Sequence, residues 1–388
     1  MIFEEKISVV MPTYNTEVSI LKEAVDSILN QTFGDFEFII IDDGSTNNSV
    51  EYLKSLQDQR VKIIRNDTNI GITKSLNIGL RAAKGKYIAR MDSDDIAFPD
   101  RFEKQYAFME SHPDVFVCGA KVRQIKDKLL PATQQADQPK KESVFFKDKN
   151  LRRKKNTGIT DIKKVEDMES YRVRMLFGNP GPMHPTAFLN HEKLIKSHIE
   201  YDEEFVYAQD YNLWMRISSI GQICILPEEL LYYRTHSGQI SKVHLKMQKK
   251  CAQMTQRKLL EQLFGYVTDD DLYFHNTHSM RYRYDENTKI SSRAIQWYEK
   301  IIAANKIKKI YNQKKLVKYI EQVKFNLIAH SITNEMSSYE KGLLLFQYLP
   351  FSTASKFLLY ILNYSRVNLL NAPLPVNSRG TPLPRNSR

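Results

Sequence analysis

Cysteine is scarce in this sequence, with three residues among 388. Cys118, Cys224 and Cys251 are widely spaced, and no two of them form a C-x-x-C pair. This spacing excludes a disulfide framework and a cysteine-based zinc site. Such cysteine usage is typical of a protein that stays in a reducing compartment.

Long hydrophobic runs are also lacking. No segment approaches the roughly 20 apolar residues that a membrane-spanning helix needs. Residues 1–6 have neither the basic region nor the long apolar stretch that marks a signal peptide. We therefore expect a cytoplasmic protein. Its 42% hydrophobic and 26% charged content is typical of a globular chain, and its length allows two domains.

Acidic charge is concentrated at the start of the chain and becomes sparse later. Residues 1–120 contain 13 Lys+Arg and 19 Asp+Glu, a net charge of −6, so the remainder carries +18 to give the total of +12. The acidic part suits a metal site, and the basic part suits an anionic partner: nucleic acid, lipid head groups or a phosphorylated acceptor. A well-solvated surface would explain the basic charge equally simply.

Apolar runs alternate with helical patterns over the first hundred residues. Strands are predicted at 7–11, 36–41, 61–65 and 87–91, and helices at 19–29, 50–56 and 72–83. This alternation predicts an α/β fold with a doubly wound, mostly parallel sheet. Two of the strands end in acidic clusters, Asp42-Asp43 and Asp92-Ser93-Asp94-Asp95. Because the carboxyl ends of parallel strands lie along one edge, we expect both clusters to face one crevice.

The rest of the chain divides into four predicted parts. After a helix at 102–110 and a strand at 115–120, residues 121–170 are predicted to form a basic, mobile insertion. Residues 171–241 complete the first domain, with strands at 187–189 and 223–226. Residues 242–372 are predicted as a basic helical region that packs as a small domain or lies in a membrane interface. Residues 373–388 are predicted to be a disordered tail.

Five ordered motifs carry a family resemblance. VVMPTYN (9–15), SILNQTF (27–33), IDDGST (41–46), NIG (69–71) and MDSDD (91–95) resemble the family 2 glycosyltransferases of GT-A fold. HPT (184–186), the Gln209-Asp210 pair and residues 233–241 extend the resemblance to about residue 241. It implies a GT-A-like sheet followed by a smaller helical region, and an inverting enzyme of the bacterial surface-polysaccharide type.

The resemblance also implies a set of residues that bind the nucleotide-sugar donor. These are Pro12, Tyr14, Asn15, Asp43, Lys74, Asp92, Ser93, Asp94 and His184. Tyr14 would pack on the uracil of a UDP-sugar. A solvated helix lysine is an equally simple interpretation of Lys74, and a structural histidine of His184.

A metal site is implied at the MDSDD motif. Asp94 would be the direct ligand of Mn²⁺ or Mg²⁺, Asp92 would lie nearer the ribose or a bound water, and His236 would be a third ligand. The ion would bridge the diphosphate and stabilise the leaving group as a Lewis acid.

Asp210 matches the general base of the family. It would deprotonate the acceptor hydroxyl during a single displacement that inverts the anomeric carbon. A structural role as a helix-start acid is the simpler alternative for Asp210. Family members usually have a Glu-Asp pair at this position, whereas this chain has Gln209-Asp210. Any contact that the Glu makes with the donor is therefore in doubt here. The Q-x-x-R-W signature of processive members is absent, and Trp214-Met215-Arg216 reverses its order, so transfer of a single sugar is expected.

The expected partners are a UDP-sugar donor and a saccharide or lipid-linked acceptor of capsule or lipopolysaccharide synthesis. The basic C-terminal part would contact an anionic membrane surface, at the inner face of the cell membrane. A sugar-nucleotide pyrophosphorylase is the alternative enzyme, but it would need a Gly-rich, basic loop where Pro12-Thr13-Tyr14-Asn15 stands. A nucleic-acid-binding module is disfavoured because the aromatic residues are not interleaved with the basic runs.

Overall fold

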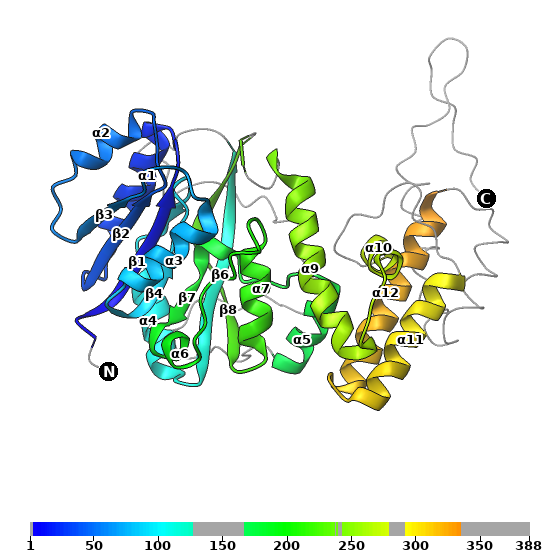
Figure 1. The fold of residues 1–388 in the computed structure, drawn as a ribbon. Helices are drawn as coiled ribbons and strands as arrows, with labels where there is room; N and C mark the ends of the chain where they lie inside the picture. The colour runs from blue at the N-terminus through cyan, green and yellow to red at the C-terminus, as the bar shows by residue number, and fades with distance from the viewer. Residues whose placement is uncertain (1–2, 127–166, 237, 240–242, 279–291, 335–388) are drawn as a thin grey trace, which may run out of the picture. The chain divides into compact units, whose positions relative to one another are not determined.

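The computed structural model describes residues 3–126, 167–236, 238–239, 243–278 and 292–334 (Figure 1). Two compact units emerge, one of Met1–Asn276 with Ile302–Tyr319 and one of Thr277–Ile301 with Ile320–Arg388. Most of the predicted 121–170 insertion, the predicted 373–388 tail and the stretch from 335 to 372 lie outside the described residues. The division of the chain at residue 241 stays a prediction.

An eight-stranded sheet forms the centre of the first unit. Its order is β3-β2-β1-β4-β7-β6-β8-β5, and β3, β2, β1 and β4 run parallel. The strands are β1 (Glu5–Thr13), β2 (Phe36–Asp42), β3 (Val61–Arg65), β4 (Gly85–Arg90), β5 (Ile96–Ala97), β6 (Val115–Lys126), β7 (Phe188–Asn190) and β8 (Gln222–Thr235).

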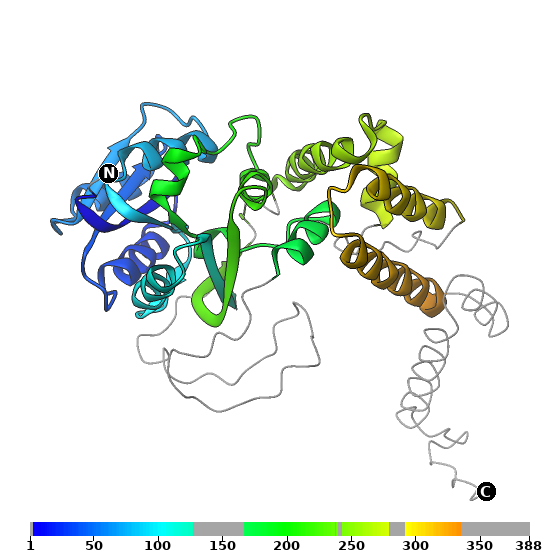
Figure 2. The same ribbon diagram turned by 90° about the horizontal axis from the view of Figure 1, so that it is seen from below.

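Helices cover both faces of the sheet (Figure 2). The helices of this layered part are α1 (Val18–Leu29), α2 (Ser49–Lys54), α3 (Ile72–Ala82), α4 (Arg101–Ser111), α5 (Met168–Phe177), α6 (His191–Lys196) and α7 (Gln209–Ser218), with a 3₁₀ turn at His184–Thr186.

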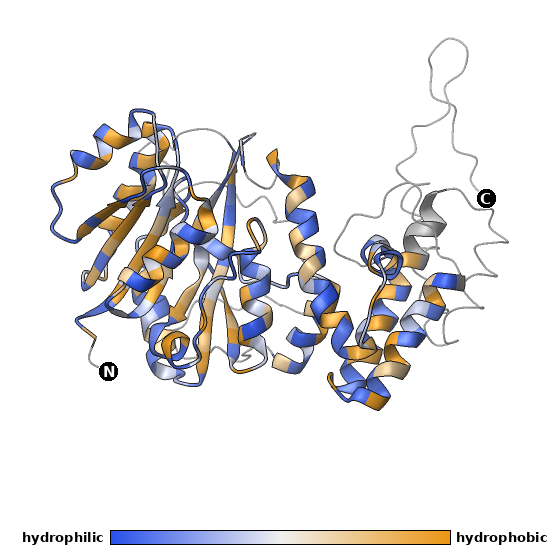
Figure 3. Ribbon diagram, viewed as in Figure 1, coloured by the Kyte–Doolittle hydropathy of each residue, from blue (hydrophilic) through white to orange (hydrophobic). Residues whose placement is uncertain are grey.

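Alternation along the buried strands explains why two helical layers form. Val9 and Ala89 belong to the core cluster that contains the apolar residues of α1 and α4. Val10 points to the other face, where its side chain meets Gly79 of α3. Because successive side chains of a strand point to opposite faces, near-continuous apolar strands need cover on both sides. Figure 3 shows these central strands as the most hydrophobic part of the ribbon.

The predicted mixed α/β sheet is confirmed, and its second half differs in detail from the prediction. β7 is antiparallel to its neighbours β4 and β6. The predicted strand at 223–226 is part of a longer strand, β8, which pairs in parallel with β6 as far as Lys126↔Thr235. Pairing with β8 also carries β6 beyond the predicted end at residue 120, through a mostly polar stretch in which Val122 packs against the core. The pairing with β8 maintains this extension, because its few apolar residues give no strand pattern.

Two short elements were not predicted. β5 has two residues and pairs antiparallel with β8, Ile96 opposite Tyr232. α6 begins after Asn190, whose side chain accepts a hydrogen bond from the backbone N of Lys193, an N-cap. Both elements are too short to produce a periodic sequence pattern.

Helices follow the sheet, as predicted. They are α9 (Leu245–Phe264), α10 (Asp269–His278), α11 (Ser292–Lys308) and α12 (Gln313–Asn334). Within the second unit, the apolar side chains of Trp297, Ile301, Ile320 and Val323 are buried. Among the described residues, no helix is both long enough and apolar enough to cross a bilayer.

Candidate active site

Three carboxylates gather directly after strand β4. Asp92, Asp94 and Asp95 follow Arg90, the last residue of that strand. Ligand oxygens from the three aspartates all lie within 4.8 Å of one another. β4 pairs in parallel with β1, so the cluster lies at the carboxyl ends of parallel strands, where open α/β sheets bind ligands.

Two buried arginines pair with this cluster. Arg90 and Arg234 are at most 3% exposed. Nη2 of Arg90 forms an ion pair with Oδ1 of Asp92. Arg234 donates from its backbone N to Oδ1 of Asp95 (2.9 Å) and from Nε to the carbonyl oxygen of Asp94 (2.8 Å). The guanidinium of Arg234 forms an ion pair with Glu23. Because a buried charge is tolerated only when it is paired, Arg90 is balanced by Asp92 and Arg234 by Glu23, while Arg234 holds the cluster by hydrogen bonds.

A third buried arginine supports the end of β4 by hydrogen bonds. Arg101 donates from Nη2 to the carbonyl oxygen of Arg90 (2.7 Å) and from Nε to Oε1 of Gln105 (3.0 Å). Burial, with repulsion from Arg90, lowers the pKa of Arg101 to about 9. Arg101 therefore fixes the backbone from which the carboxylates project.

The chemistry of the cluster fits a divalent cation. Burial, followed by repulsion from Asp94 and Asp92, raises the pKa of Asp95 well above its ordinary value. Burial also raises the pKa of Asp92, against the attraction of Arg90. Within the described part of the chain, Oδ2 of Asp95 is buried without a hydrogen-bond partner. A bound cation would coordinate that oxygen and relieve the repulsion among the carboxylates. Carboxylate oxygens are the ligands that Mg²⁺ and Mn²⁺ prefer.

His236 reaches the cluster from β8. Its Nε2 lies 2.9 Å from Oδ2 of Asp94. The strand β8 ends one residue earlier, at Thr235, and pairs with β5 directly after the aspartates. This pairing brings a residue from the end of the predicted first domain to the MDSDD motif.

The loops after β1, β2 and β4 are joined by hydrogen bonds. Asn15, at φ +50°, donates from its backbone N to Oγ of Ser45 (2.9 Å) and accepts at Oδ1 from the backbone N of Thr46 (2.8 Å). The hydroxyls of Thr16 and Ser93 are 2.8 Å apart. Three strand ends are thereby held as one surface, as the sequence predicted from their shared edge.

Asp43 uses its carboxylate inside this surface. It accepts at Oδ1 from Nδ2 of Asn66 and the backbone N of Ile70, and at Oδ2 from the backbone N of Gly71, all at 2.9 Å. A carboxylate oxygen accepts two hydrogen bonds, so Oδ2 retains one lone pair. Gly44, at φ +75°, lies so close to the same turn that a Cβ would be 2.6 Å from the carbonyl carbon of Thr68. Only glycine allows the two loops to approach this closely.

The remaining predicted donor contacts differ in exposure. Tyr14 is 49% exposed, and Lys74, in the first turn of α3, is exposed as well. Pro12 is buried within β1, opposite Ile41. Tyr14 thus presents an open ring at the end of β1, whereas Pro12 shapes the strand end from within.

The candidate base lies in the first turn of α7. Oδ2 of Asp210 accepts a hydrogen bond from Nδ2 of Asn179 (2.8 Å), and Oδ1 of Asn179 accepts one from the backbone N of Gly181 (3.0 Å). Burial raises the pKa of Tyr201, and the charges of Asp210 and Asp92 raise it further, against the attraction of Arg90. Tyr201 thus lies near both the candidate base and the acidic cluster.

The loop that carries Asn179 is packed tightly against β6. A Cβ on Gly119 would lie 2.1 Å from Cβ of Pro182. Oγ1 of Thr186 accepts a hydrogen bond from the backbone N of Ala120 (3.1 Å). These contacts fix the position of the loop against β6.

His184 is a buried member of the same region. Its Nε2 lies 2.7 Å from the hydroxyl of Tyr201, and its ring meets that of Trp214 edge-on, with centroids 6.1 Å apart. Burial, with repulsion from Arg90, lowers the pKa of His184 well below its ordinary value. His184 is therefore neutral at physiological pH, and its ring packs against Trp214 of α7.

Comparison with known proteins decides the family. The family model described as Glycosyl transferase family 2 matches residues 8–174. The chain is 32% identical over 255 residues to an uncharacterised glycosyltransferase of Haemophilus influenzae, across 65% of this chain and 72% of that protein. This chain belongs to the family 2 glycosyltransferases.

Two further relatives agree with this membership. An uncharacterised glycosyltransferase of Methanocaldococcus jannaschii is 35% identical over 236 residues, across 59% of this chain and 70% of that protein. The amylovoran biosynthesis glycosyltransferase AmsE of Erwinia amylovora is 31% identical over 240 residues, across 61% of this chain and 78% of that protein. The family 2 enzyme described here is thus an inverting glycosyltransferase with a GT-A-like sheet, as the motifs implied.

The geometry adds residues to the site of this family 2 enzyme that sequence reasoning missed. Asp95, which the sequence placed in the acidic cluster without a metal role, offers one of its ligand oxygens, and Arg90, Asn179 and Tyr201 lie beside the cluster or the candidate base. The position of Arg90 at the end of an apolar strand was the one available signal, because a charge there is buried. Asn179 and Tyr201 had no signal, since their partners are distant in sequence.

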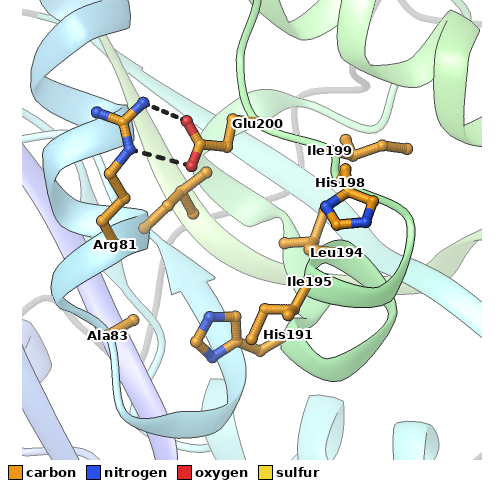
Figure 4. A pocket seen from close by; sticks show the side chains of 9 residues that line it. Arg81, Ala83, His191, Leu194, Ile195, His198, Ile199 and Glu200 are labelled. Atoms are coloured by element: carbon orange, nitrogen blue, oxygen red, sulfur yellow. Dashed lines mark hydrogen bonds and ion pairs between the residues drawn. The ribbon is translucent and has the colours of Figure 1, made fainter.

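A separate cavity of about 420 Å³ lies away from this site (Figure 4). Arg81 donates from Nε to Oε1 of Glu200 (3.0 Å) at its rim, and His191 and His198 contribute side chains to its wall. His191 contacts the carbonyl oxygen of Gly85, at the start of β4. The cavity is therefore at the opposite end of β4 from the aspartates, and none of the predicted donor, metal or base residues line it.

Proposed function

We propose that this enzyme transfers a single sugar from a nucleotide-sugar donor, a UDP-sugar, to a hydroxyl of a saccharide or lipid-linked acceptor. The observation that carries the proposal is the acidic cluster Asp92, Asp94 and Asp95, with His236 on Asp94 and with Asp210 in the first turn of α7. The cluster suits the diphosphate end of a donor, and Asp210 suits the acceptor hydroxyl. Transfer between them is the reaction class of the family.

The nucleoside would bind on the loops after β1 and β2. Tyr14 offers an open ring for stacking on the base, and Asp43 retains one lone pair for a ribose hydroxyl or a base N–H. Lys74, exposed in the first turn of α3, would add a positive contact to the nucleotide. Asn15 and Ser93 would act by holding the three loops in register.

The metal, Mn²⁺ or Mg²⁺, would be held by Asp94, Asp92 and His236, with Asp95 supplying its unpartnered oxygen from within. When bound, such an ion neutralises the diphosphate and stabilises it as a leaving group. Arg90 holds Asp92, and Arg234 holds the backbone of Asp94, so the carboxylates are oriented in advance.

Asp210 would act as the general base. Its carboxylate would accept the proton of the acceptor hydroxyl while that oxygen attacks the anomeric carbon, and the bond to the diphosphate breaks on the opposite face. Asn179 orients the carboxylate through the 2.8 Å hydrogen bond to Oδ2. His184, neutral and bonded to Tyr201, shapes the wall between base and cluster rather than moving a proton.

The biological context we propose is the synthesis of a surface polysaccharide of the capsule or lipopolysaccharide type. The name of the Erwinia relative, an amylovoran biosynthesis glycosyltransferase, supports this class of product. The absence of the processive Q-x-x-R-W signature supports one transfer per acceptor.

The test combines donor binding with turnover. A thermal-shift panel of nucleotide sugars, each with Mn²⁺ and with EDTA, should show a rise in melting temperature for a UDP-sugar that disappears with EDTA. Asp94→Asn should abolish this metal-dependent rise. Asp100→Asn is the matched control, since the Asp100 carboxylate, just before α4, pairs with Lys104 one turn along that helix and lies outside the acidic cluster.

Turnover then separates the roles of the two aspartates. Asp210→Asn should retain the donor-dependent rise in melting temperature and lose transfer, measured as UDP release in the presence of acceptor. Near-normal transfer by Asp210→Asn would remove Asp210 from the role of base. If no nucleotide sugar stabilised the folded wild-type protein, the donor site itself would be wrong.

The pyrophosphorylase alternative has no support in the structure. The loop after β1 is tied to Ser45 and Thr46 through Asn15, and it contains no glycine with which to wrap a triphosphate. Membership of the family 2 glycosyltransferases argues in the same direction.

A further inference from the structure

The segment that leads into α9 carries positive charge without any acid. Residues 236–260 contain six cations and no Asp or Glu: Lys242, Lys246, Lys249, Lys250, Arg257 and Lys258. The first turn of α9 has no acidic residue and includes Lys246. Lysine at a helix N-terminus opposes the helix dipole, which favours acids there. A lysine in the first turn, with no acid beside it, therefore indicates a role other than helix stability.

Apolar side chains are exposed at the same place. Val243, Leu245 and Met247 are 61%, 46% and 47% exposed, and Val206, in the loop before α7, is 38% exposed. Lys246 and Lys250 are exposed between and beside them. Figure 3 shows this end of α9 as alternating hydrophobic and hydrophilic segments. We define these six residues, Val206, Val243, Leu245, Lys246, Met247 and Lys250, as the α9 patch.

The backbone beneath the α9 patch is firmly held. The rings of Tyr207 and His244 are stacked, with centroids 4.6 Å apart and planes 8° apart. Oγ1 of Thr73, in α3, donates to the carbonyl oxygen of Phe205 (3.1 Å). Further along α9, Cys251 is buried against Phe205. The apolar side chains are therefore exposed by a fixed backbone rather than by a frayed helix end.

The α9 patch is next to the catalytic elements in the chain. Val206 precedes Asp210 by four residues, and Val243 follows His236 by seven. The Tyr207–His244 stack holds the segment before α7 against the segment before α9. A surface that binds the patch would thus be close to the region between the candidate base and the acidic cluster.

We propose that the α9 patch binds the surface of an anionic lipid bilayer. Exposed aliphatic side chains flanked by lysines are the combination by which an amphipathic helix end lies in a lipid interface, where apolar groups enter the acyl boundary and lysines meet anionic head groups. Aliphatic rather than aromatic exposed residues disfavour single-stranded nucleic acid, which needs stacking platforms. A second copy of the chain is disfavoured because a self-paired patch would juxtapose like charges.

Lipid binding by the α9 patch does not depend on the proposed function, but its consequence does. If the acceptor is lipid-linked, this contact would place Asp210 at the bilayer surface where the acceptor hydroxyl is presented. The bilayer contact would then increase transfer to a lipid-linked acceptor without changing donor affinity.

The test is sedimentation of the full chain with vesicles of phosphatidylcholine, with and without phosphatidylglycerol. Lys246→Gln/Lys250→Gln should lower partitioning onto the anionic vesicles by about 30-fold, since each lysine near such a surface contributes roughly a fivefold gain in binding. Leu245→Ser/Met247→Ser should lower it on both vesicle types. The matched controls are Lys22→Gln/Lys54→Gln, on α1 and α2, and Ile220→Ser, an exposed isoleucine at the end of α7.

Several outcomes would overturn the proposal. Equal partitioning of the wild type onto neutral and anionic vesicles would exclude an anionic surface, and patch variants that bind like the wild type would place the contact elsewhere. Concentration-dependent dimerisation that only the patch variants lose, without vesicle binding, would assign the patch to a second copy. Unchanged donor-dependent thermal shifts in all variants would show that they fold, and would separate a failure here from a failure of the proposed function.

Discussion

His236 Nε2 lies 2.9 Å from Asp94 Oδ2, although 142 positions of sequence separate the two residues. The contact exists because β8 pairs with β5, directly after the aspartates, and ends at Thr235. The candidate metal site is therefore a product of strand pairing between distant parts of the chain. The site therefore forms only when β8 has paired with β5, and the MDSDD motif alone does not complete it.

Replacing His236 should weaken the metal without removing the donor site. We expect His236→Gln to lower the affinity for Mn²⁺ by at least about tenfold, because one ligand is lost while the three aspartates remain. Calorimetric titration of Mn²⁺ in the presence of UDP measures this. His198→Gln, an exposed histidine at the opposite end of β4, is the control, and an unchanged Mn²⁺ affinity in His236→Gln would exclude His236 as a ligand.

Arg90 and Asp92 should behave as a coupled ion pair, with the arginine buried and the aspartate partly exposed. Arg90→Met should lower the free energy of unfolding by about 3 kcal/mol, because it leaves the Asp92 carboxylate without its buried counter-charge. Arg90→Met/Asp92→Asn should be more stable than the single Arg90→Met variant. A double-mutant cycle in urea measures the coupling, and additive effects of the two substitutions would show that the pair contributes nothing.

Asn179 should matter for turnover more than for donor binding. Asn179→Ala removes the hydrogen bond to Oδ2 of Asp210 and should lower kcat by about tenfold, whereas Asp210→Asn should lower it by about 10³-fold or more. The KM for the donor should stay close to the wild-type value in both variants. A rise in donor KM with unchanged kcat would instead place Asn179 at the nucleotide.

Gly119 should tolerate no side chain. Gly119→Ala would bring a Cβ to 2.1 Å from Cβ of Pro182, so either β6 or the loop that carries Asn179 must shift. We expect a loss of about 1–3 kcal/mol in the free energy of unfolding, the usual range for overpacking. Gly34→Ala is the matched control, since nothing lies within 4 Å of its added Cβ; equal stability of the two variants would contradict this packing.

His184 should make the protein less stable in mild acid. Its pKa in the folded protein is lowered well below 6.5 by burial, so below pH 6.5 the unfolded chain binds a proton that the folded chain does not. Stability should therefore fall as the pH falls below 6.5, by about 1 kcal/mol for the first pH unit from this residue. His184→Gln should flatten the dependence of urea unfolding on pH between 7.5 and 5.5, in contrast to His198→Gln; parallel curves for His184→Gln and the wild type would refute the assignment.

The first hundred residues could be predicted closely because their signals are local. β3 was predicted at its observed limits, and the apolar alternation of β1 and β2 fixed their positions to within two residues. The motifs after these strands also gave the candidate donor and metal residues, because the edge of a parallel sheet collects whatever follows its strands.

The second half resisted prediction because its structure depends on distant partners. β7 reverses direction between β4 and β6, and the polar end of β6 is a strand only because β8 lies beside it. Arg90, Asn179 and Tyr201 gain their roles from contacts across the fold that neither spacing nor composition encodes. The residue types were visible in the sequence, and their neighbours were not.

The strand order has a consequence for how the molecule is made. β7, β6 and β8 are inserted between β4 and β5, so β4 has an open edge on the ribosome until residues 188–190 have been synthesised. An unpaired edge in the middle of a future sheet is open to pairing with another nascent chain. A truncated N-terminal fragment that retains the whole MDSDD motif would therefore aggregate rather than bind metal, and a fragment that folds needs to extend past His236.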